Sequence, residues 1–569
     1  MALSLLVLLA ILSSGCAIPA PSVTLGRTTV VGRAIPEFQQ EFFGGLPYAL
    51  PPIGPRRLSP PVLTTQLNVE TFDASEYGFS CVQLPQEQGV PLENMSEDCL
   101  TINILRPADL PRNALLPVMF WTYGGGFVGG NSSVYNASVV VAQSVARGTP
   151  VVYVNFNYRL GALGFPVGAD AARAGSLNLG MKDQLTALKW VHANIGAFGG
   201  DKTKVTIFGE SAGSMMTSVL FFNPDLEMFV RAAILESGLA ATMGLYPPTR
   251  NQGSWDSFIA AIPECASLPA RQLFSCVKNN ASTSSILTAT ATVKAASLDA
   301  YQWMPVVDGD IIPDLPSKLL AAGRFAKIPF IAGTNLDEAT GFDLIYPSYV
   351  VDSTDALKEL LFQSVFRTSA NPAALPSVAL QRGVDELLKL YPDIPALGSP
   401  FGTGNATFGK STTFKRAAAL LTDMWFVSLR RQAMDAATAH GLQPYGYLFT
   451  QPQPEVPAAY GVAHGLEVPS VYGAPFDTSD SSVALSKIMV DYWLSFATSL
   501  TPNDGCGAPN GNRTPYTTRP VSRVPHSLTL NAIVQAVIQL NGANLTMIPD
   551  NFRSEQTMYM AANSALWGH

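Results

Sequence analysis

Six short apolar runs are the sequence feature that most constrains the fold. Each has four to seven residues, is rich in β-branched and aromatic side chains, and contains no charged residue. Continuous apolar runs of this length are typical of strands that are buried on both faces, as in a parallel sheet. The runs span residues 117–123, 150–156, 205–208, 232–235, 328–333 and 445–449.

Helical patterns lie between these runs. Residues 178–201 carry Met181, Leu185, Leu188 and Val191 at helical spacing, and then end in glycines. Strands that alternate with helices predict an α/β fold with a large, mostly parallel central sheet flanked by helices.

Two later segments complete the expected outline of the fold. After about residue 350 the pattern becomes more helical, which predicts a helix-rich C-terminal part. The Ala- and Thr-rich residues 287–297 are interpreted as a surface loop.

Composition excludes several classes of protein. Of 569 residues, 47% are hydrophobic and 14% are charged, which favours a large buried core over a disordered chain. The chain has 35 Lys and Arg against 42 Asp and Glu, a net charge of -7, and it contains no basic cluster. We therefore expect no nucleic-acid partner.

The N-terminal segment is typical of a secretory signal peptide. A short apolar stretch is followed by small residues suited to cleavage near Ala17 or Ala20. A lipoprotein signal that ends at Cys16 is the alternative. We expect a signal peptide over about 1–20, a single catalytic domain over 21–569, an extracellular location and no stable membrane insertion.

Cysteines and glycosylation sequons agree with secretion. Cys81 and Cys99 form one close pair and Cys265 and Cys276 another, each suited to closing a short loop in an oxidising compartment, while Cys506 is left over. Possible N-glycosylation sites are Asn94, Asn131, Asn136, Asn280, Asn405, Asn512 and Asn544.

The segment "VTIFGESAGSMM" places Ser211 between Gly209 and Gly213 in a G-x-S-x-G pattern. Such a serine sits on a sharp turn from a strand into a helix, with its hydroxyl exposed as a nucleophile. The alternative is a turn serine that only caps a helix.

A glycine-rich loop follows the run at 117–123. Gly124, Gly125 and Gly126 can turn backbone N–H groups toward a substrate oxygen, whereas the alternative is a flexible turn without a role. Ligands of such folds bind at the carboxyl ends of the strands.

A base and an acid are available at other strand ends. His464 lies in a loop after the run at 445–449, and Asp337 or Glu338 lies just past the run at 328–333. A surface histidine and solvated loop acids are the alternative. The other histidines are His192, His440, His526 and His569.

Several motifs in a fixed order resemble one family. The order serine, acid, histidine is that of α/β hydrolases. The segments "IFGESAGS", "YGGGF", "SEDCLTINILRP", "NFNYRLGALGF", "NLGMKDQLTALKWV" and "GLPYALPPIGPRR" are similar to those of the type B carboxylesterase and lipase family, which includes fungal lipases, sterol esterases and cholinesterases. The resemblance covers about residues 25–505, and the fungal lipase branch is the most similar.

The resemblance implies an α/β-hydrolase fold and a serine ester hydrolase that works through an acyl-enzyme. It implies Ser211 as nucleophile, His464 as base and Glu338, rather than Asp337, as the acid, so replacing Glu338 should be far more damaging. It also implies no metal or organic cofactor. Further residues implied are the oxyanion-hole donors Gly125, Gly126 and Ala212, the supporting residues Glu210 and Ser237, and the disulfides Cys81–Cys99 and Cys265–Cys276.

The substrate class stays open at this stage. The loop between Cys81 and Cys99 contains no aromatic residue, which argues against a choline site, and it is shorter than the flap of fungal lipases. Carboxylesters, sterol or carotenoid esters and feruloyl esters with bulky apolar or aromatic parts fit equally. The alternatives are a true triacylglycerol lipase with interfacial activation and a non-enzymatic binding or adhesion protein. The oligomeric state is not indicated.

Overall fold

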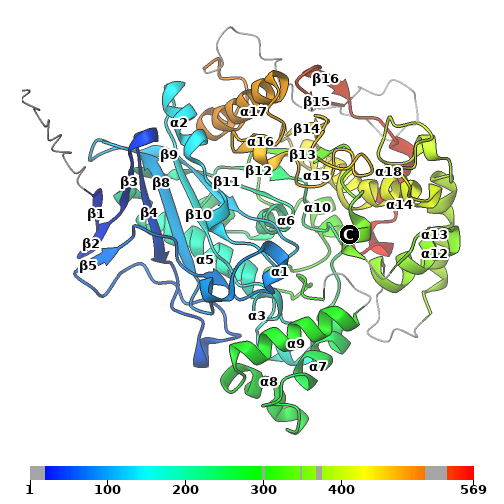
Figure 1. Ribbon diagram of the computed structural model, residues 1–569, viewed down its shortest axis with the longest axis horizontal. Helices are drawn as coiled ribbons and strands as arrows, with labels where there is room; N and C mark the ends of the chain where they lie inside the picture. The colour runs from blue at the N-terminus through cyan, green and yellow to red at the C-terminus, as the bar shows by residue number, and fades with distance from the viewer. Residues whose placement is uncertain (1–19, 298–301, 347–348, 367–374, 507–534) are drawn as a thin grey trace, which may run out of the picture.

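The computed structural model describes residues 20–297, 302–346, 349–366, 375–506 and 535–569. The expected signal peptide up to residue 19, and with it Cys16, lies outside the described residues, as do Asn512 and His526. The chain builds one large sheet with helices packed around it (Figure 1).

Eleven strands form the main sheet in the described part of the chain, in the order β16-β15-β14-β13-β12-β11-β9-β10-β8-β4-β3. The seven strands from β15 to β10 run parallel, which confirms the predicted sheet and all six predicted strands. These parallel strands are β9 (Leu116–Thr122), β10 (Val152–Phe156), β11 (Gly200–Glu210), β12 (Ala232–Glu236), β13 (Phe330–Asn335), β14 (Tyr445–Phe449) and β15 (Ala536–Leu540).

Antiparallel strands extend both edges of this sheet, and the sequence analysis did not find them. In β8 the buried Asn103 interrupts the apolar run, although its amide is satisfied inside the sheet by Asn155 at 2.9 Å. The antiparallel strands are β3 (Arg33–Ile35), β4 (Gln40–Pro47), β8 (Thr101–Pro107) and β16 (Thr546–Pro549). Two small sheets hold β1 (Ser22–Leu25), β2 (Thr28–Val31) and β5 (Thr71–Asp73), and β6 (Ser80–Cys81) with β7 (Met95–Ser96).

Helices cover both faces of the main sheet. α2 (Ser138–Ala146) and α17 (Asp480–Ser499) pack on one side, and α5 (Leu179–Asn194) and α6 (Ala212–Val219) on the other (Figure 1). α5 is the helix that the sequence predicts. Among the described helices, none is both long and apolar enough to cross a bilayer.

The segment read as a surface loop at 287–297 is instead part of helix α9 (Thr283–Ala296), so that expectation was wrong. The hydroxyl of Ser282 caps the helix by accepting the N–H of Ser285. Ile286, Ala289 and Val293 recur at helical spacing and are buried, and this burial holds the helix despite its many threonines.

A second core lies beside the sheet. It is built from helices that follow residue 338 and from the C-terminal α18 (Ser554–Ala562). This agrees with the helix-rich C-terminal part that the sequence predicts. Its helices are α11 (Phe342–Ile345), α12 (Thr354–Leu360), α13 (Val378–Leu390) and α14 (Thr412–Thr422). The side chain of Met243 packs against both cores, so the two meet near this residue.

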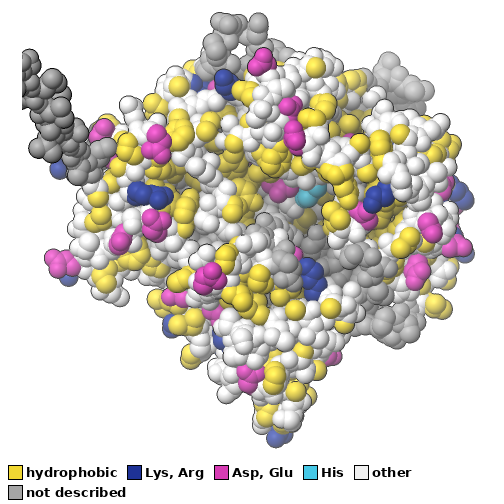
Figure 2. Space-filling model, viewed as in Figure 1, with side chains coloured by type: hydrophobic (Ala, Val, Ile, Leu, Met, Phe, Trp, Pro, Cys, Tyr) yellow, Lys and Arg dark blue, Asp and Glu magenta, His cyan; other side chains and the backbone are white. Residues whose placement is uncertain are grey.

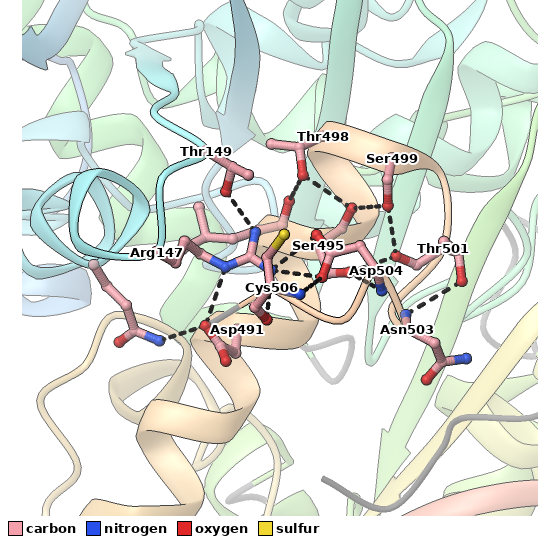
Figure 3. A network of polar contacts seen from close by, with 12 residues as sticks. Arg147, Thr149, Asp491, Ser495, Thr498, Ser499, Thr501, Asn503, Asp504 and Cys506 are labelled. Atoms are coloured by element: carbon pink, nitrogen blue, oxygen red, sulfur yellow. Dashed lines mark hydrogen bonds and ion pairs between the residues drawn. The ribbon is translucent and has the colours of Figure 1, made fainter. Parts of the chain in front are cut away.

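Arg147, just after α2, makes a buried polar network that joins α2 to the end of α17 (Figure 3). Its guanidinium lies 3.3 Å from Asp491 and donates to both carboxylate oxygens of Asp504, at 2.8 and 2.9 Å. Thr149 accepts a further bond, and the Arg147 side chain is only 1% exposed. Buried charges of opposite sign compensate each other, so removing the guanidinium leaves the two carboxylates buried without their compensating charge.

Arg147→Ala should therefore destabilise the fold by about 3 to 5 kcal/mol, because it leaves Asp491 and Asp504 buried without their cation. Arg173→Ala is the matched control, since Arg173 is 73% exposed and pairs only with Asp170 on the surface. Its effect should be below about 1 kcal/mol. Urea unfolding of both variants measures the difference, and equal losses would contradict this account of the network.

Candidate active site

Ser211 stands at the sharp turn between β11 and α6. Its backbone has φ 56° and ψ -128°, a conformation that L residues rarely adopt. Gly209 and Gly213 make this turn possible, because a Cβ on either would come well within 3.0 Å of the carbonyl oxygen of Thr122 at the end of β9. The strand, turn and helix predicted around this serine are all present.

The imidazole of His464 lies between Ser211 and Glu338. Its Nε2 is 2.7 Å from Ser211 Oγ, and its Nδ1 is 2.7 Å from Glu338 Oε2. Glu338 is buried, and its other carboxylate oxygen accepts the N–H of Asn335 at 2.6 Å. A hydroxyl, an imidazole and a carboxylate in hydrogen-bonded series can remove a proton from the hydroxyl.

Of the two adjacent acids that the spacing could not separate, Glu338 is the one that reaches the imidazole. The carboxylate of Asp337 points elsewhere and accepts the backbone N–H groups of Val462 and Phe401.

The glycine-rich loop faces the same serine. Gly125 and Gly126 have φ of 102° and 61°, in the region that favours glycine, and Gly126 lines the cavity that contains Ser211. Ala212 is the first residue of α6, so its N–H lies at the positive end of that helix. Gly126 and Ser211 thus line one cavity, and Ala212 follows Ser211 directly in the chain.

The site opens into a mostly apolar cavity of about 410 Å³. Figure 2 shows this face hollowed near its centre, with a histidine inside and hydrophobic side chains gathered round the hollow. The apolar side chains that line the cavity include Phe127, Met215, Met243, Met304, Leu344, Ile345, Trp425, Phe426 and Val456.

Comparison with known proteins gives the family. A profile described as "Carboxylesterase family" matches residues 19–529. The chain belongs to the carboxylesterase family. It is therefore a carboxylic ester hydrolase, and the resemblance drawn from its motifs is confirmed.

Several relatives of this esterase carry lipase or esterase names. It is 32% identical to "Secreted lipase 1" of Botryotinia fuckeliana, with 99% of both chains covered, and 33% identical to "Lipase 2" of Diutina rugosa, with 98% of both covered. It is 31% identical to "Carboxylesterase 1E" of Mus musculus over 89% of this chain and 91% of that protein.

A solved structure supports the fold. EstA of Aspergillus niger superposes with a TM-score of 0.79 at 23% identity, covering 97% of this chain and 99% of that one. The predicted α/β-hydrolase fold is confirmed.

The esterase buries two further acids near its histidine, Glu210 and Glu467, and a third, Glu236, near those two. Glu210 Oε1 is 3.2 Å from His464 Nε2. Glu467 accepts hydrogen bonds from the hydroxyl of Ser237, at 3.3 Å, and from the amide of Asn335. Glu236, paired with Glu210 on the neighbouring strand, accepts the indole N–H of Trp493 at 2.7 Å.

Burial and mutual repulsion shift the pKa values of these groups. Burial raises the pKa of Glu210 to about 8 and that of Glu467 to about 7, and it raises the pKa of Glu236 well above its usual range. Burial alone would lower the pKa of His464. The nearby carboxylates, Glu210 first and Glu338 next, outweigh burial and raise that pKa to about 9.

The predicted supporting residues lie at different distances from the histidine. Glu210 lies 3.2 Å from it, whereas the hydroxyl of Ser237 donates to Glu467. The sequence analysis missed Glu467 and Glu236. Their positions, three residues after His464 and immediately before Ser237, were the available signals.

Both predicted disulfides are formed, Cys81–Cys99 and Cys265–Cys276. The first tethers the glycine-rich loop, since the side-chain amide of Gln83 bonds with both the N–H and the carbonyl of Gly130. Cys506 is exposed and lies outside both disulfides.

One predicted glycosylation site does not fit the fold. Asn131 is only 3% exposed, and its side-chain oxygen accepts the N–H of Ser133, so a glycan on Asn131 would have no room. The sequons at Asn94, Asn136, Asn280, Asn405 and Asn544 are exposed.

The other described histidines stand apart from the site. His192 lies near the end of α5 against the ring of Phe229. His440 follows α15 (Ser428–Ala439), and His569 is buried elsewhere.

Proposed function

We propose that this esterase cleaves uncharged esters with bulky apolar or aromatic parts through an acyl-enzyme, with Ser211 as nucleophile, His464 as base and Glu338 as its orienting acid. The observation that carries the proposal is the hydrogen-bonded series from Ser211 Oγ to His464 to Glu338, with 2.7 Å at each step. That series lies in an apolar cavity suited to an ester.

The reaction begins when Ser211 Oγ attacks the ester carbonyl and His464 Nε2 takes its proton. The imidazolium that forms is stabilised by Glu338 on the other side of the ring. His464 then returns the proton to the departing alcohol. Water hydrolyses the acyl-enzyme by the same steps and frees Ser211.

The tetrahedral intermediate carries an oxyanion. We propose that the N–H groups of Gly125, Gly126 and Ala212 donate hydrogen bonds to it. Donors of this kind are each worth about 10² to 10³ in rate. The start of α6 adds the positive end of a helix dipole at the same place.

The substrate class follows from the side chains around the cavity. Among the residues that the structure describes, its lining includes no Lys or Arg, and three of its apolar side chains are the adaptable methionines Met215, Met243 and Met304. Such a wall favours uncharged acyl and alcohol groups of varied shape.

We also propose that residues 21–569 form one catalytic domain that is secreted after removal of a signal peptide of about 20 residues. The two disulfides and the exposed sequons support this. So do relatives named as secreted lipases from Botryotinia fuckeliana and Gibberella zeae.

A true triacylglycerol lipase is the second candidate, because several relatives are named lipases. The loop between Cys81 and Cys99 argues against a lid of the lipase kind. Its side chains Val82, Leu84 and Val90 are at most 7% exposed, and although Leu92 is 56% exposed, the loop offers only a small apolar face to an oil surface.

Ser211→Ala should abolish hydrolysis of a soluble p-nitrophenyl ester, with a loss of at least about 10⁴-fold in kcat, because it removes the nucleophile. Ser214→Ala is the matched control: its hydroxyl lies on the same helix but donates to the carbonyl of Gly238. The control should keep most of its activity. A folded Ser211→Ala variant with a tenth of normal turnover would rule out the proposed nucleophile.

The pH profile of kcat/KM should show an acid limb whose midpoint lies above the ordinary pKa of histidine, 6.5, because the base must be neutral and its pKa is raised. Glu210→Gln removes a negative charge that raises this pKa, so the midpoint should move to lower pH. Glu41→Gln, at an ion pair with Arg106, serves as the control. An unchanged midpoint in Glu210→Gln would contradict the assignment of the acid limb to His464.

Little interfacial activation is expected, because the loop that would form a lid is packed down. The initial rate on tributyrin, measured through its solubility limit, should saturate smoothly. A several-fold upward break at that limit would instead favour the true lipase.

A further inference from the structure

The loop that ends in the base histidine is bound residue by residue to the turn after β13. We call Tyr460–His464 the histidine loop and Asn335–Thr340 the β13 turn. The hydroxyl of Thr340 donates to the carbonyl of Tyr460 at 2.6 Å, and the amide of Asn335 donates to the carbonyl of Ala463 at 2.8 Å. The N–H of Asp337 donates to the carbonyl of Val462 at 3.0 Å.

The carboxylate of Asp337 is the hub of this arrangement. Its Oδ2 accepts the N–H of Val462 at 3.0 Å. Its Oδ1 accepts the hydroxyl of Ser399 at 2.7 Å and the N–H of Phe401 at 2.8 Å. The side chain is 2% exposed, so one buried carboxylate joins three segments that are distant in sequence.

The histidine loop is shaped to admit this carboxylate. Gly461 has φ of 56°, and a Cβ at this position would come well within 3.0 Å of Asp337 Oδ2. Only glycine combines that backbone conformation with so close an approach. The loop therefore closes around Asp337 at Gly461, three residues before His464.

We propose that Asp337 is a positioning residue for His464: its carboxylate holds the histidine loop at the place where the imidazole meets both Glu338 and Ser211. This inference rests on the proposed function, because it assigns Asp337 a part in the reaction of that same site. Asp337 makes its contacts away from the reacting atoms and acts through the loop.

The three donors around Asp337 demand a carboxylate. Two backbone N–H groups and one hydroxyl converge on its oxygens, so each oxygen must accept. An asparagine would turn an NH₂ group toward at least one of these donors, and a buried donor that faces another donor is costly. The histidine loop would then shift, although the volume of the side chain is unchanged.

The arrangement around Asp337 continues from Phe401 to Phe426, a residue that lines the cavity. The guanidinium of Arg553 lies 3.8 Å from the ring centroid of Phe401 and forms two hydrogen bonds with Asp423, at 2.6 and 2.7 Å. Asp423 opens the π-helical turn η11 (Asp423–Val427), which carries Phe426. The ring of Phe426 lies 5.0 Å from that of His464.

The test compares Asp337→Asn with the wild-type enzyme on a soluble p-nitrophenyl ester, measuring kcat, KM and the pH profile of kcat/KM. Misplacing a reacting group slightly costs up to about 10²-fold, so kcat should fall about 10- to 100-fold while KM changes less than about threefold. The acid-limb midpoint should move to lower pH, because His464 is held less closely against Glu338.

Two controls separate positioning from general stability. Asp393→Asn makes the same chemical change at an exposed residue bonded to Thr413, and it should leave all three quantities unchanged. Arg147→Ala weakens the fold through the network at α17, so it should lower the melting temperature but leave the acid-limb midpoint in place.

Each outcome either supports or overturns the positioning role of Asp337. The positioning role is overturned if a folded Asp337→Asn variant has the midpoint and kcat of the wild type. It is also overturned if kcat falls while the midpoint stays unchanged, as the midpoint does in Arg147→Ala. If Asp337→Asn does not fold, Ser399→Ala is tested in its place. It should show a smaller fall in kcat and a midpoint shift in the same direction. An unchanged midpoint in Ser399→Ala also overturns the positioning role. If Ser211→Ala hydrolyses the ester as fast as the wild type does, the proposed function fails instead.

Discussion

The close approach of α6 to the end of β9 is the constraint on which the site depends. Gly209 and Gly213 leave no side chain between the helix and the carbonyl of Thr122, and the serine between them is pushed into a rare backbone conformation. Because β11, β13 and β14 are parallel, the residues that follow them arrive at the same edge of the sheet. The contact at β9 therefore sets where the serine stands, and the other strand ends supply what surrounds it.

Three buried carboxyl groups gathered around one imidazole are the second constraint. Glu210, Glu338 and Glu467 are all buried there: Glu210 lies 3.2 Å from the imidazole, and Asn335 donates to both Glu338 and Glu467. Neutral hydrogen-bond donors such as Asn335 offset part of the desolvation cost of burying these carboxyl groups. The same charges favour an imidazolium at His464, which is the species that forms when a serine gives up its proton.

Local sequence was enough for six of the seven parallel strands and for the serine turn, since a continuous apolar run or a glycine pair acts through its nearest neighbours; β15 was missed. It failed for β8, where Asn103 breaks the run but bonds inside the sheet, and for residues 287–297, where burial holds a helix of modest propensity. Spacing alone could not choose between Asp337 and Glu338. That choice depends on His464, which is 126 residues further along the chain, so only the family resemblance or the fold can supply it.

The contact of Arg553 with Asp423 also bears on how the protein is made. Translation delivers the serine and histidine to the folding chain well before it delivers Arg553, whose pairing with Asp423 anchors the turn that carries Phe426. The strands up to β14 can pair while the chain is still attached to the ribosome, but this wall of the cavity cannot yet be anchored. Until then the turn that carries Phe426 lacks this anchor, and apolar surface that is exposed for a time during synthesis is what chaperones protect.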